Sequence, residues 1–304
     1  MYQLLALING IILSVMISVN GNLSVQYSAF TAAAIIHAVG SLFALLLCAF
    51  QKNRKPVWTH RPRWIYLGGA IGVFTTVFQN LAFTCISITS VIALGLLGQT
   101  VTSLVIDSSG LFGMEKRPLP RYAMIGLSLS VFGIFVMLDT TVTTAAPGAA
   151  ISFASGISMV LSRTANARLA EKTGALQGSL VNHLTGLPIT VGLALAAAAI
   201  SGTPVTASAG GSFRLWIYLG GALGVIVVML LNITVPKIPG FQLTLLVFVG
   251  QVFTGILLDS AAGSYHTGTS LWGGIIIAAG IAVNMILEQV TAVLKKNPDR
   301  KSTR

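Results

Sequence analysis

The sequence predicts an all-α polytopic membrane protein of ten transmembrane helices, arranged as two inverted five-helix repeats. Three observations predict this class: long apolar stretches, basic residues confined to short connections, and a sequence that repeats itself. The chain has 304 residues, of which 54% are hydrophobic and only 8% charged, whereas soluble domains carry about 25% charged residues. A bilayer core of about 30 Å takes roughly 20 helical residues. Membrane-spanning helices therefore account for almost the whole chain.

Ten apolar spans follow one another along the chain. They cover residues 3–20, 28–50, 64–84, 87–107 and 121–139 in the first half, and 145–164, 176–200, 215–235, 241–259 and 271–290 in the second. The triplet Asn20-Gly21-Asn22 predicts a helix stop after the first span, and the Ser/Thr-rich segment 84–90 predicts a turn. Pro236 and Pro239 separate the eighth and ninth spans.

The basic residues predict the orientation of these spans. If the spans alternate in direction, 17 of the 18 Lys and Arg residues fall on one side and only Arg214 on the other. They are Lys52, Arg54, Lys55, Arg61, Arg63, Lys116, Arg117, Arg121, Arg163, Arg168, Lys172, Lys237, Lys295, Lys296, Arg300, Lys301 and Arg304. Positive loops stay cytoplasmic, so both termini are expected in the cytoplasm. The net charge of +11 then reflects membrane topology, and no nucleic-acid partner is expected.

The chain also repeats itself. WIYLGGAIGV at 64–73 returns as WIYLGGALGV at 216–225, with nine identities in ten. An offset of 152 pairs Gln99 with Gln251, and an offset of 146 pairs His37 with His183. We therefore divide the chain into a first repeat (1–140), a second repeat (141–290) and a basic cytoplasmic tail (291–304). Because five spans is an odd number, the second repeat is expected to enter the membrane from the opposite side, as in many secondary transporters.

Small residues at helical spacing predict close helix packing. Gly68 and Gly72 lie one turn apart, and Gly220 and Gly224 repeat the pattern in the second half. The other members of the packing set are Gly98 and its counterpart Gly250. Structural packing is one interpretation of these glycines, and contacts that slide during transport are the other.

Four pairs of polar residues are the candidates for a substrate or coupling site. They are His37 and His183, Asn80 and Asn232, Gln99 and Gln251, and Asp107 and Asp259. Polar groups in hydrocarbon need a partner or a water-filled cavity, and imidazole can carry a proton near neutral pH. Each pair also has a structural interpretation. The histidines would be hydrogen-bonded core residues, the amides would form hydrogen bonds between helices, and the carboxylates would close turns at helix ends.

Motifs of soluble enzymes are missing from the sequence. The chain contains no G-x-x-x-x-G-K-[ST] phosphate loop, no HExxH and no CxxC. Its two cysteines, Cys48 and Cys85, lie in apolar segments, which argues against a disulfide framework or a cysteine zinc site. We expect no enzymatic activity, no metal and no cofactor.

Several of these residues carry a resemblance to a known family. The motifs are Asn20-Gly21-x-Leu23, Gly68-Gly69-x-x-Gly72, Gly98-Gln99, Asp107, Gly110-Leu111-Phe112-Gly113 and Arg117-Pro118-Leu119. On these motifs the chain resembles a fused, two-copy member of the YdcZ-type family within the bacterial drug/metabolite transporter superfamily. The resemblance is close over about 1–140 and looser over 145–290. The second half keeps Gly250-Gln251 and Asp259 but lacks the Gly-Leu-Phe-Gly and Arg-Pro-Leu segments.

The resemblance implies a multi-pass transporter of the bacterial inner membrane that exports a small metabolite or drug. The expected mechanism is alternating access between the inverted repeats, coupled to protons or another ion. The substrate site is expected between spans 1–4 and 6–9, with Asp107 and Asp259 as coupling or gate groups. Spans 5 and 10 are expected at the periphery, where they are available to form a homodimer.

Two alternative functions stay open at this point. A lipid or lipid-linked carrier flippase would need a groove open to lipid beside Arg121, Arg163 or Arg168. A non-transporting membrane scaffold would have all its intramembrane polar groups paired and no cavity between the halves.

Overall fold

Ten long helices form the protein in its computed structural model, which describes all residues except 53–54, 58–61, 84, 87, 139–140, 203–213, 262–267 and 297–304. These helices are α1 (Tyr2–Gln26), α2 (Ala29–Ala49), α3 (Gly68–Phe83), α4 (Ile88–Ser109), α5 (Ala123–Val136), α7 (Ala146–Thr173), α8 (Ala175–Ser201), α9 (Gly220–Thr234), α10 (Gly240–Ala261) and α11 (Thr269–Lys296). The short elements η1 (Arg63–Tyr66), η2 (Leu111–Gly113), α6 (Thr141–Thr144) and η3 (Leu215–Leu219) lie between them. The described part of the chain contains no strand, so the all-helical prediction is confirmed.

Seven of the described helices are long and apolar enough to cross a bilayer, namely α1, α2, α4, α8, α9 together with η3, α10 and α11. Of the others, α3 has 16 residues and α5 has 14. Helix α7 has 28 residues, but its buried side includes Ser152, Ser155, Ser162 and Arg163. This polar helix packs against α3, α4, α8 and α9, so its polar groups face protein rather than lipid. The chain is therefore a polytopic membrane protein with a polar helix at its centre.

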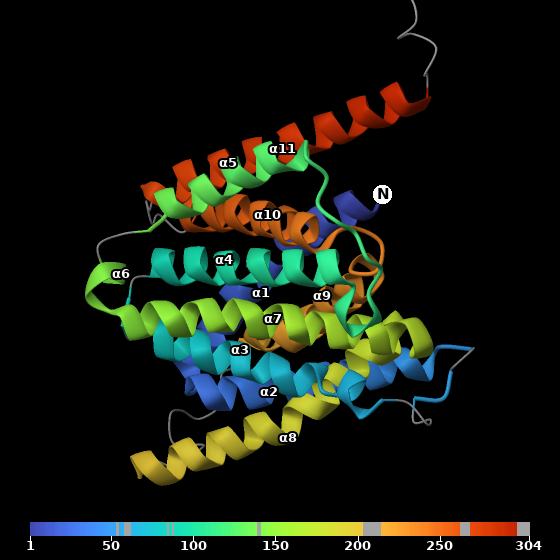
Figure 1. The fold of residues 1–304 in the computed structure, drawn as a ribbon. Coiled ribbons are helices and arrows are strands. Elements are labelled where there is room, and N and C mark those ends of the chain that lie inside the picture. Colours follow the sequence, from blue (N-terminus) through green and yellow to red (C-terminus); the bar gives the residue numbers. More distant parts are fainter. Residues whose placement is uncertain are drawn as a thin grey trace, which may run out of the picture.

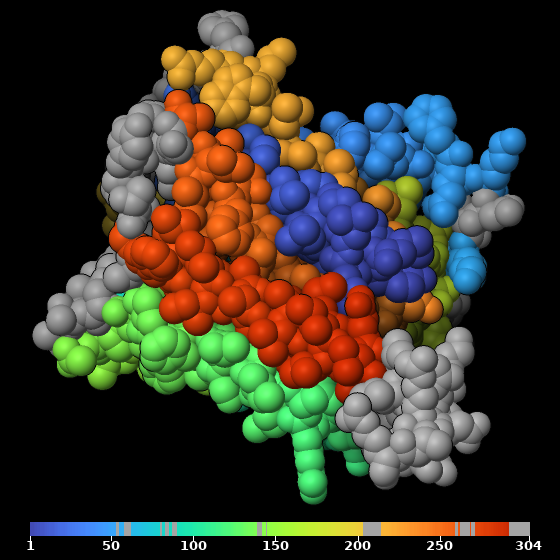
Figure 2. All heavy atoms as spheres, turned by 90° about the horizontal axis from the view of Figure 1, so that it is seen from above, coloured from blue at the N-terminus to red at the C-terminus, as the bar shows by residue number. Residues whose placement is uncertain are grey.

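The helices lie in layers, with α5 and α11 paired along one side (Figure 1). Below that pair follow α10 and α4, then α1 and α7, and finally α2, α3 and α8. Figure 2 shows α5 and α11 side by side across one face of the molecule. Spans 5 and 10 were predicted to be peripheral, and α5 and α11 occupy such a position. Lipid-facing side chains such as Phe132 and Trp272 on this pair are more than half exposed.

The packing glycines lie at close contacts between the two halves. A Cβ atom on Gly98 would fall on the backbone carbonyl oxygen of Phe153, and one on Gly250 would fall on that of Leu7. These two contacts join α4 to α7 and α10 to α1. They correspond residue for residue, because Gly98 pairs with Gly250 at the offset of 152 and Leu7 pairs with Phe153 at the offset of 146. Only glycine allows the two backbones to approach so closely.

Gly68 and Gly220 make a different kind of contact from the one predicted. A Cβ atom on Gly68 would fall on the side-chain oxygen of Asn166, and one on Gly220 would fall on that of Asn20. The closest backbone approach of α3 is instead at Gly69, against the carbonyl oxygen of Asn182. Gly72 and Gly224 have more room, since the nearest atoms would lie 3.1 and 3.2 Å from an added Cβ atom. Here the missing side chains leave space for polar groups rather than for a helix backbone.

The predicted helix stop at Asn20-Gly21-Asn22 is wrong, because α1 continues to Gln26. The Asn22 side-chain amide donates to the carbonyl oxygen of Ser18 one turn earlier, at 2.9 Å. Leu23 is fully buried in a cluster with Ala32 and Ile217. Burying a leucine side chain stabilises by about 1.5–3 kcal/mol, which outweighs the cost of about 1 kcal/mol for a glycine inside a helix.

The sixth span was also predicted too short, and Arg163 was wrongly placed in the loop after it. Helix α7 continues nine residues beyond Thr164 to Thr173, and Arg163 lies inside it with only 6% of its surface exposed. Ala165, Ala167 and Leu169 are buried along this extension, so tertiary packing maintains the helix beyond the apolar run. Gly174 ends it with a φ of 105°, a conformation that favours glycine.

Candidate functional site

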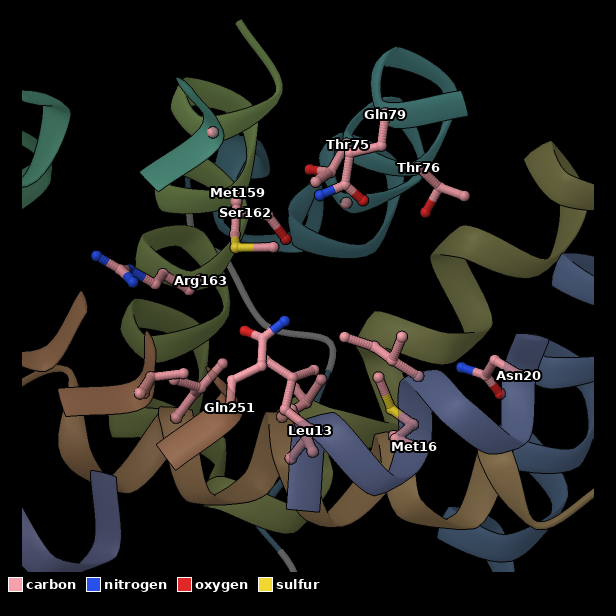
Figure 3. Close-up of a pocket in the computed structure, with 18 of the residues that line it drawn as sticks. Leu13, Met16, Asn20, Thr75, Thr76, Gln79, Met159, Ser162, Arg163 and Gln251 are labelled. Carbon is pink, nitrogen blue, oxygen red and sulfur yellow. The ribbon is translucent and has the colours of Figure 1, made fainter. Parts of the chain in front are cut away.

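A cavity of about 550 Å³ lies among the eight helices other than α5 and α11. This volume is in the range of pockets that hold drug-sized ligands. Side chains from both halves line it, and Figure 3 shows Leu13, Met16 and Asn20 of α1 facing Thr75, Thr76 and Gln79 of α3 across open space. The cavity lies between the helices that correspond to spans 1–4 and 6–9, where a substrate site was predicted.

Five of the eight predicted site residues lie in the cavity wall. They are His37, Gln99, His183, Asn232 and Gln251. Asn80 is part of α3 and Asp259 part of α10, but their side chains lie outside the described part of the structure. Asp107 is described, is buried, and does not line the cavity.

The two histidines face each other between α2 and α8, with ring centroids 5.5 Å apart. His37 Nδ1 lies 3.3 Å from the carbonyl oxygen of His183, and His183 Nδ1 lies 2.9 Å from that of Ser179. A carbonyl oxygen only accepts hydrogen bonds, so Nδ1 carries the hydrogen in both rings. In the neutral rings each Nε2 is then an acceptor that can take a proton or bind a donor group.

Glycines of the opposite half set the position of these rings. A Cβ atom on Gly40 would fall on the His183 ring, and one on Gly186 would fall on the His37 ring. Gly40 and Gly186 are themselves a matched pair in the sequence repeat. The two histidines therefore occupy equivalent niches in the two halves.

Amide and hydroxyl groups supply most of the remaining polarity. Figure 3 shows the Gln251 amide directed into the cavity, opposite Met159 and Ser162. Asn232 donates from Nδ2 to the carbonyl oxygen of Ala175 at 3.0 Å, while its Oδ1 atom is buried without a hydrogen-bond partner. The Thr75 hydroxyl is likewise buried without a partner. Such groups cost free energy when unsatisfied, and a polar ligand or water would relieve that cost.

A polar seam adjoins the cavity wall, where α7 meets α4 and α10. The Nη2 atom of Arg163 donates to Ser103 Oγ at 2.7 Å, to Thr244 Oγ1 at 2.5 Å and to the carbonyl oxygen of Gly240 at 3.3 Å. Figure 3 shows the guanidinium directed away from the Gln251 amide. We call this set of contacts the α4–α10 seam.

Asp107 belongs to the same seam. Its Oδ2 atom accepts a hydrogen bond from the backbone N–H of Phe241 at 3.1 Å, so the carboxylate caps the first turn of α10. This position suits a negative charge, because the N-terminus of a helix carries positive partial charge. Arg117 adds a contact from its Nη2 atom to the carbonyl oxygen of Pro236 at 2.8 Å. Asp107 therefore holds two helices together and does not simply close its own turn.

Four polar residues of the cavity wall on α7 and α8 were not among the predicted residues of the small-solute site. Besides Ser162 and Arg163, these are Asn166 and Asn182, whose side chains are hydrogen-bonded to each other at 2.7 Å. The repeat did contain a signal, because Asn166 pairs with Asn20 at an offset of 146. Asn20 was assigned to a helix end and Asn166 fell beyond the predicted end of the sixth span, but both lie inside helices that line the cavity.

Comparisons with known proteins place these observations in a family. A solved structure titled "Crystal structure of protein" aligns with a TM-score of 0.68 over 95% of this chain and 97% of that chain, at 18% identity. At this identity the similarity supports the fold alone. No match to a curated protein sequence was found. The sequence model of the family described as "Putative inner membrane exporter, YdcZ" matches residues 1–136 and again residues 148–287. The chain therefore belongs to the YdcZ family, whose sequence model it matches in two successive segments.

Proposed function

We propose that this protein is a secondary transporter that exports a small metabolite or drug by alternating access between two inverted five-helix halves. All ten long helices would cross the membrane, including the shorter helices α3 and α5 and the polar helix α7, which its neighbours shield. Both termini would lie in the cytoplasm. Proton coupling through the histidine pair is part of the proposal, and a homodimer through α5 and α11 is compatible with their exposed apolar side chains.

The observation that carries the proposal is the cavity of about 550 Å³ lined by both halves. A transporter needs a central site that two similar halves can expose in turn to either side. The matched contacts of Gly98 and Gly250 support a pseudo-twofold relation between the halves. If each half can adopt the conformation of the other, exchange of the two conformations opens the cavity on the opposite side.

The same observations weigh against the two alternatives. A scaffold would have no reason to keep such a cavity, nor the unpartnered Thr75 hydroxyl beside it. A flippase would need a cationic site open to lipid, but Arg163 is buried and Arg168 is ion-paired with Glu171. Transport of a small solute through the cavity fits these two arginines better than transport of a lipid headgroup.

A proteoliposome counterflow screen tests the proposal. Purified protein would be loaded with amino acids, sugars, organic cations or organic anions, with and without a pH gradient. We expect exchange of at least one class of solute, and loss of the pH dependence after His37→Gln. Failure to exchange any class, by protein that still melts cooperatively, would exclude a transporter of small solutes.

A further inference from the structure

The cavity wall carries one formal charge among its described residues. Arg163 is that charge, and the described residues of the wall include no Asp or Glu. A buried cation needs an anionic partner, because the transfer of an unpaired charge out of water is costly. An organic cation in this cavity would face a guanidinium and no carboxylate. An organic anion would find a partner there.

We propose that Arg163 binds an oxyanion, a carboxylate or a phosphate group, on the transported substrate. This inference rests on the proposed transport function and narrows it to a substrate class. Guanidinium suits the role because its planar donors match the two oxygens of a carboxylate or phosphate group. Its charge persists at every physiological pH, so recognition would not depend on protonation of the protein.

The guanidinium retains donors for such a group. All three of its hydrogen bonds to described residues leave from Nη2, and they go to the neutral acceptors Ser103, Thr244 and Gly240. No described carboxylate lies within 4.0 Å of it to form an ion pair. Asp107, the acid of the seam, interacts electrostatically with Arg163 at longer range, but its Oδ2 atom is engaged by the backbone N–H of Phe241. Nε and Nη1 therefore have no hydrogen-bond partner among the described residues.

The repeat shows that this oxyanion site is single. Under the sequence offsets Arg163 corresponds to Ile17, Thr244 to Ile92 and Ser103 to Gly255. Ile17 and Ile92 also line the cavity, together with Leu13 and Val228. The cavity wall is therefore cationic at Arg163, whereas the matching positions of the other half are aliphatic. The substrate that fits both parts of the wall has one oxyanion group and an apolar body.

Binding at Arg163 would also act on the closure of the cavity. The three acceptors of Nη2 belong to α4 and α10, so the guanidinium links those helices through α7. An oxyanion is a stronger acceptor than a hydroxyl or a carbonyl group. A substrate that draws the guanidinium toward the cavity weakens the α4–α10 seam. Recognition of the anion and opening of the seam are thereby coupled.

Ligand binding to the purified full-length protein tests this inference. The probes are hexanoate, hexyl phosphate, neutral hexanamide and cationic hexylammonium, which share one apolar chain, and the readout is intrinsic fluorescence. We expect at least one anion to bind about tenfold or more tightly than the amide, since charge-assisted hydrogen bonds are the stronger ones. The comparison of the two anions distinguishes a carboxylate from a phosphate substrate.

Variants make the test specific to Arg163. Arg163→Gln should abolish the preference for the anion, and Arg163→Lys should retain part of it. The matched control Arg168→Gln changes an ion-paired arginine on the same helix and should leave binding unchanged. Thr244→Val removes a competing acceptor and should tighten anion binding. The inference is overturned if hexylammonium binds as tightly as the anions, if no anion binds, or if the preference survives Arg163→Gln.

The outcome separates this inference from the transport proposal. If the protein shows no preference for anions but exchanges cations or sugars in counterflow, the transport function is supported and the oxyanion site is refuted. If the protein binds anions at Arg163 but exchanges no solute, the oxyanion site is supported and the transport function is refuted.

Discussion

His37 and His183 occupy matching positions in the two halves and make matching contacts, whereas Arg163 and Ile17 match in position and differ in charge. Both pairs line the cavity. The comparison indicates that the duplicated residues build matching helix contacts in the two halves. Residues that differ between the halves make the two sides of the cavity wall chemically different.

The largest expected effect comes from breaking the matched backbone contacts. Gly98→Ala and Gly250→Ala each place a methyl group on a carbonyl oxygen of the opposite half. Overpacking of this kind costs about 1–3 kcal/mol of unfolding free energy, and the two variants should lose similar amounts. Thermal unfolding in detergent measures the loss. Gly192→Ala is the control, because nothing lies within 4 Å of the added methyl; if it destabilises the protein equally, the contact argument fails.

A second prediction concerns the symmetry of the histidine pair. His37→Gln and His183→Gln each keep a polar side chain but remove a group that binds protons near neutral pH. Uptake driven by a pH gradient should fall about tenfold or more in each variant, while exchange without a gradient persists. His60→Gln, in the connection after span 2, serves as the control. Loss of coupling in only one of the two variants would show that their equivalent geometry does not extend to function.

A smaller effect is expected from the cap on α10. Asp107→Ala removes the acceptor for the N–H of Phe241 and should cost about 1 kcal/mol. Asp107→Asn keeps a capping oxygen and should cost much less. The pair of variants therefore separates capping from charge: a stable Asp107→Asn protein that no longer transports would identify the carboxylate as a gate or coupling group. Normal transport by this variant would reduce Asp107 to a structural role.

Much of the fold follows from apolar run length and from the repeat. The ten long helices, the break between α3 and α4, and the Pro236–Pro239 turn all follow from local chemistry in the sequence. The central histidines and glutamines were found because they recur at a fixed offset and lie in otherwise apolar runs. Such signals can be read from the sequence without any knowledge of tertiary contacts.

The errors arose where tertiary packing outweighs local composition. Arg163 follows an apolar run and resembles a loop residue, but α7 is enclosed by four other helices and continues through it. No local pattern shows that a charged residue will find Ser103 and Thr244 as partners on two distant helices. Asn20, which was predicted to end the first helix, and Asn166, which fell beyond the predicted end of the sixth span, were misjudged for the same reason.

The smallest expected effect tests this explanation at Gly21. Its counterpart in the second half is Ala167, which is buried inside α7 near the C-terminal end of that helix. Nothing lies within 4 Å of a Cβ atom added to Gly21, so Gly21→Ala should raise the unfolding free energy by up to about 1 kcal/mol through helix propensity. Gly174→Ala, at a position with a φ of 105°, should instead lower it. Thermal unfolding of the two variants measures both signs. A destabilising Gly21→Ala would mean that α1 ends at Asn20 after all, and that the two halves differ there as well.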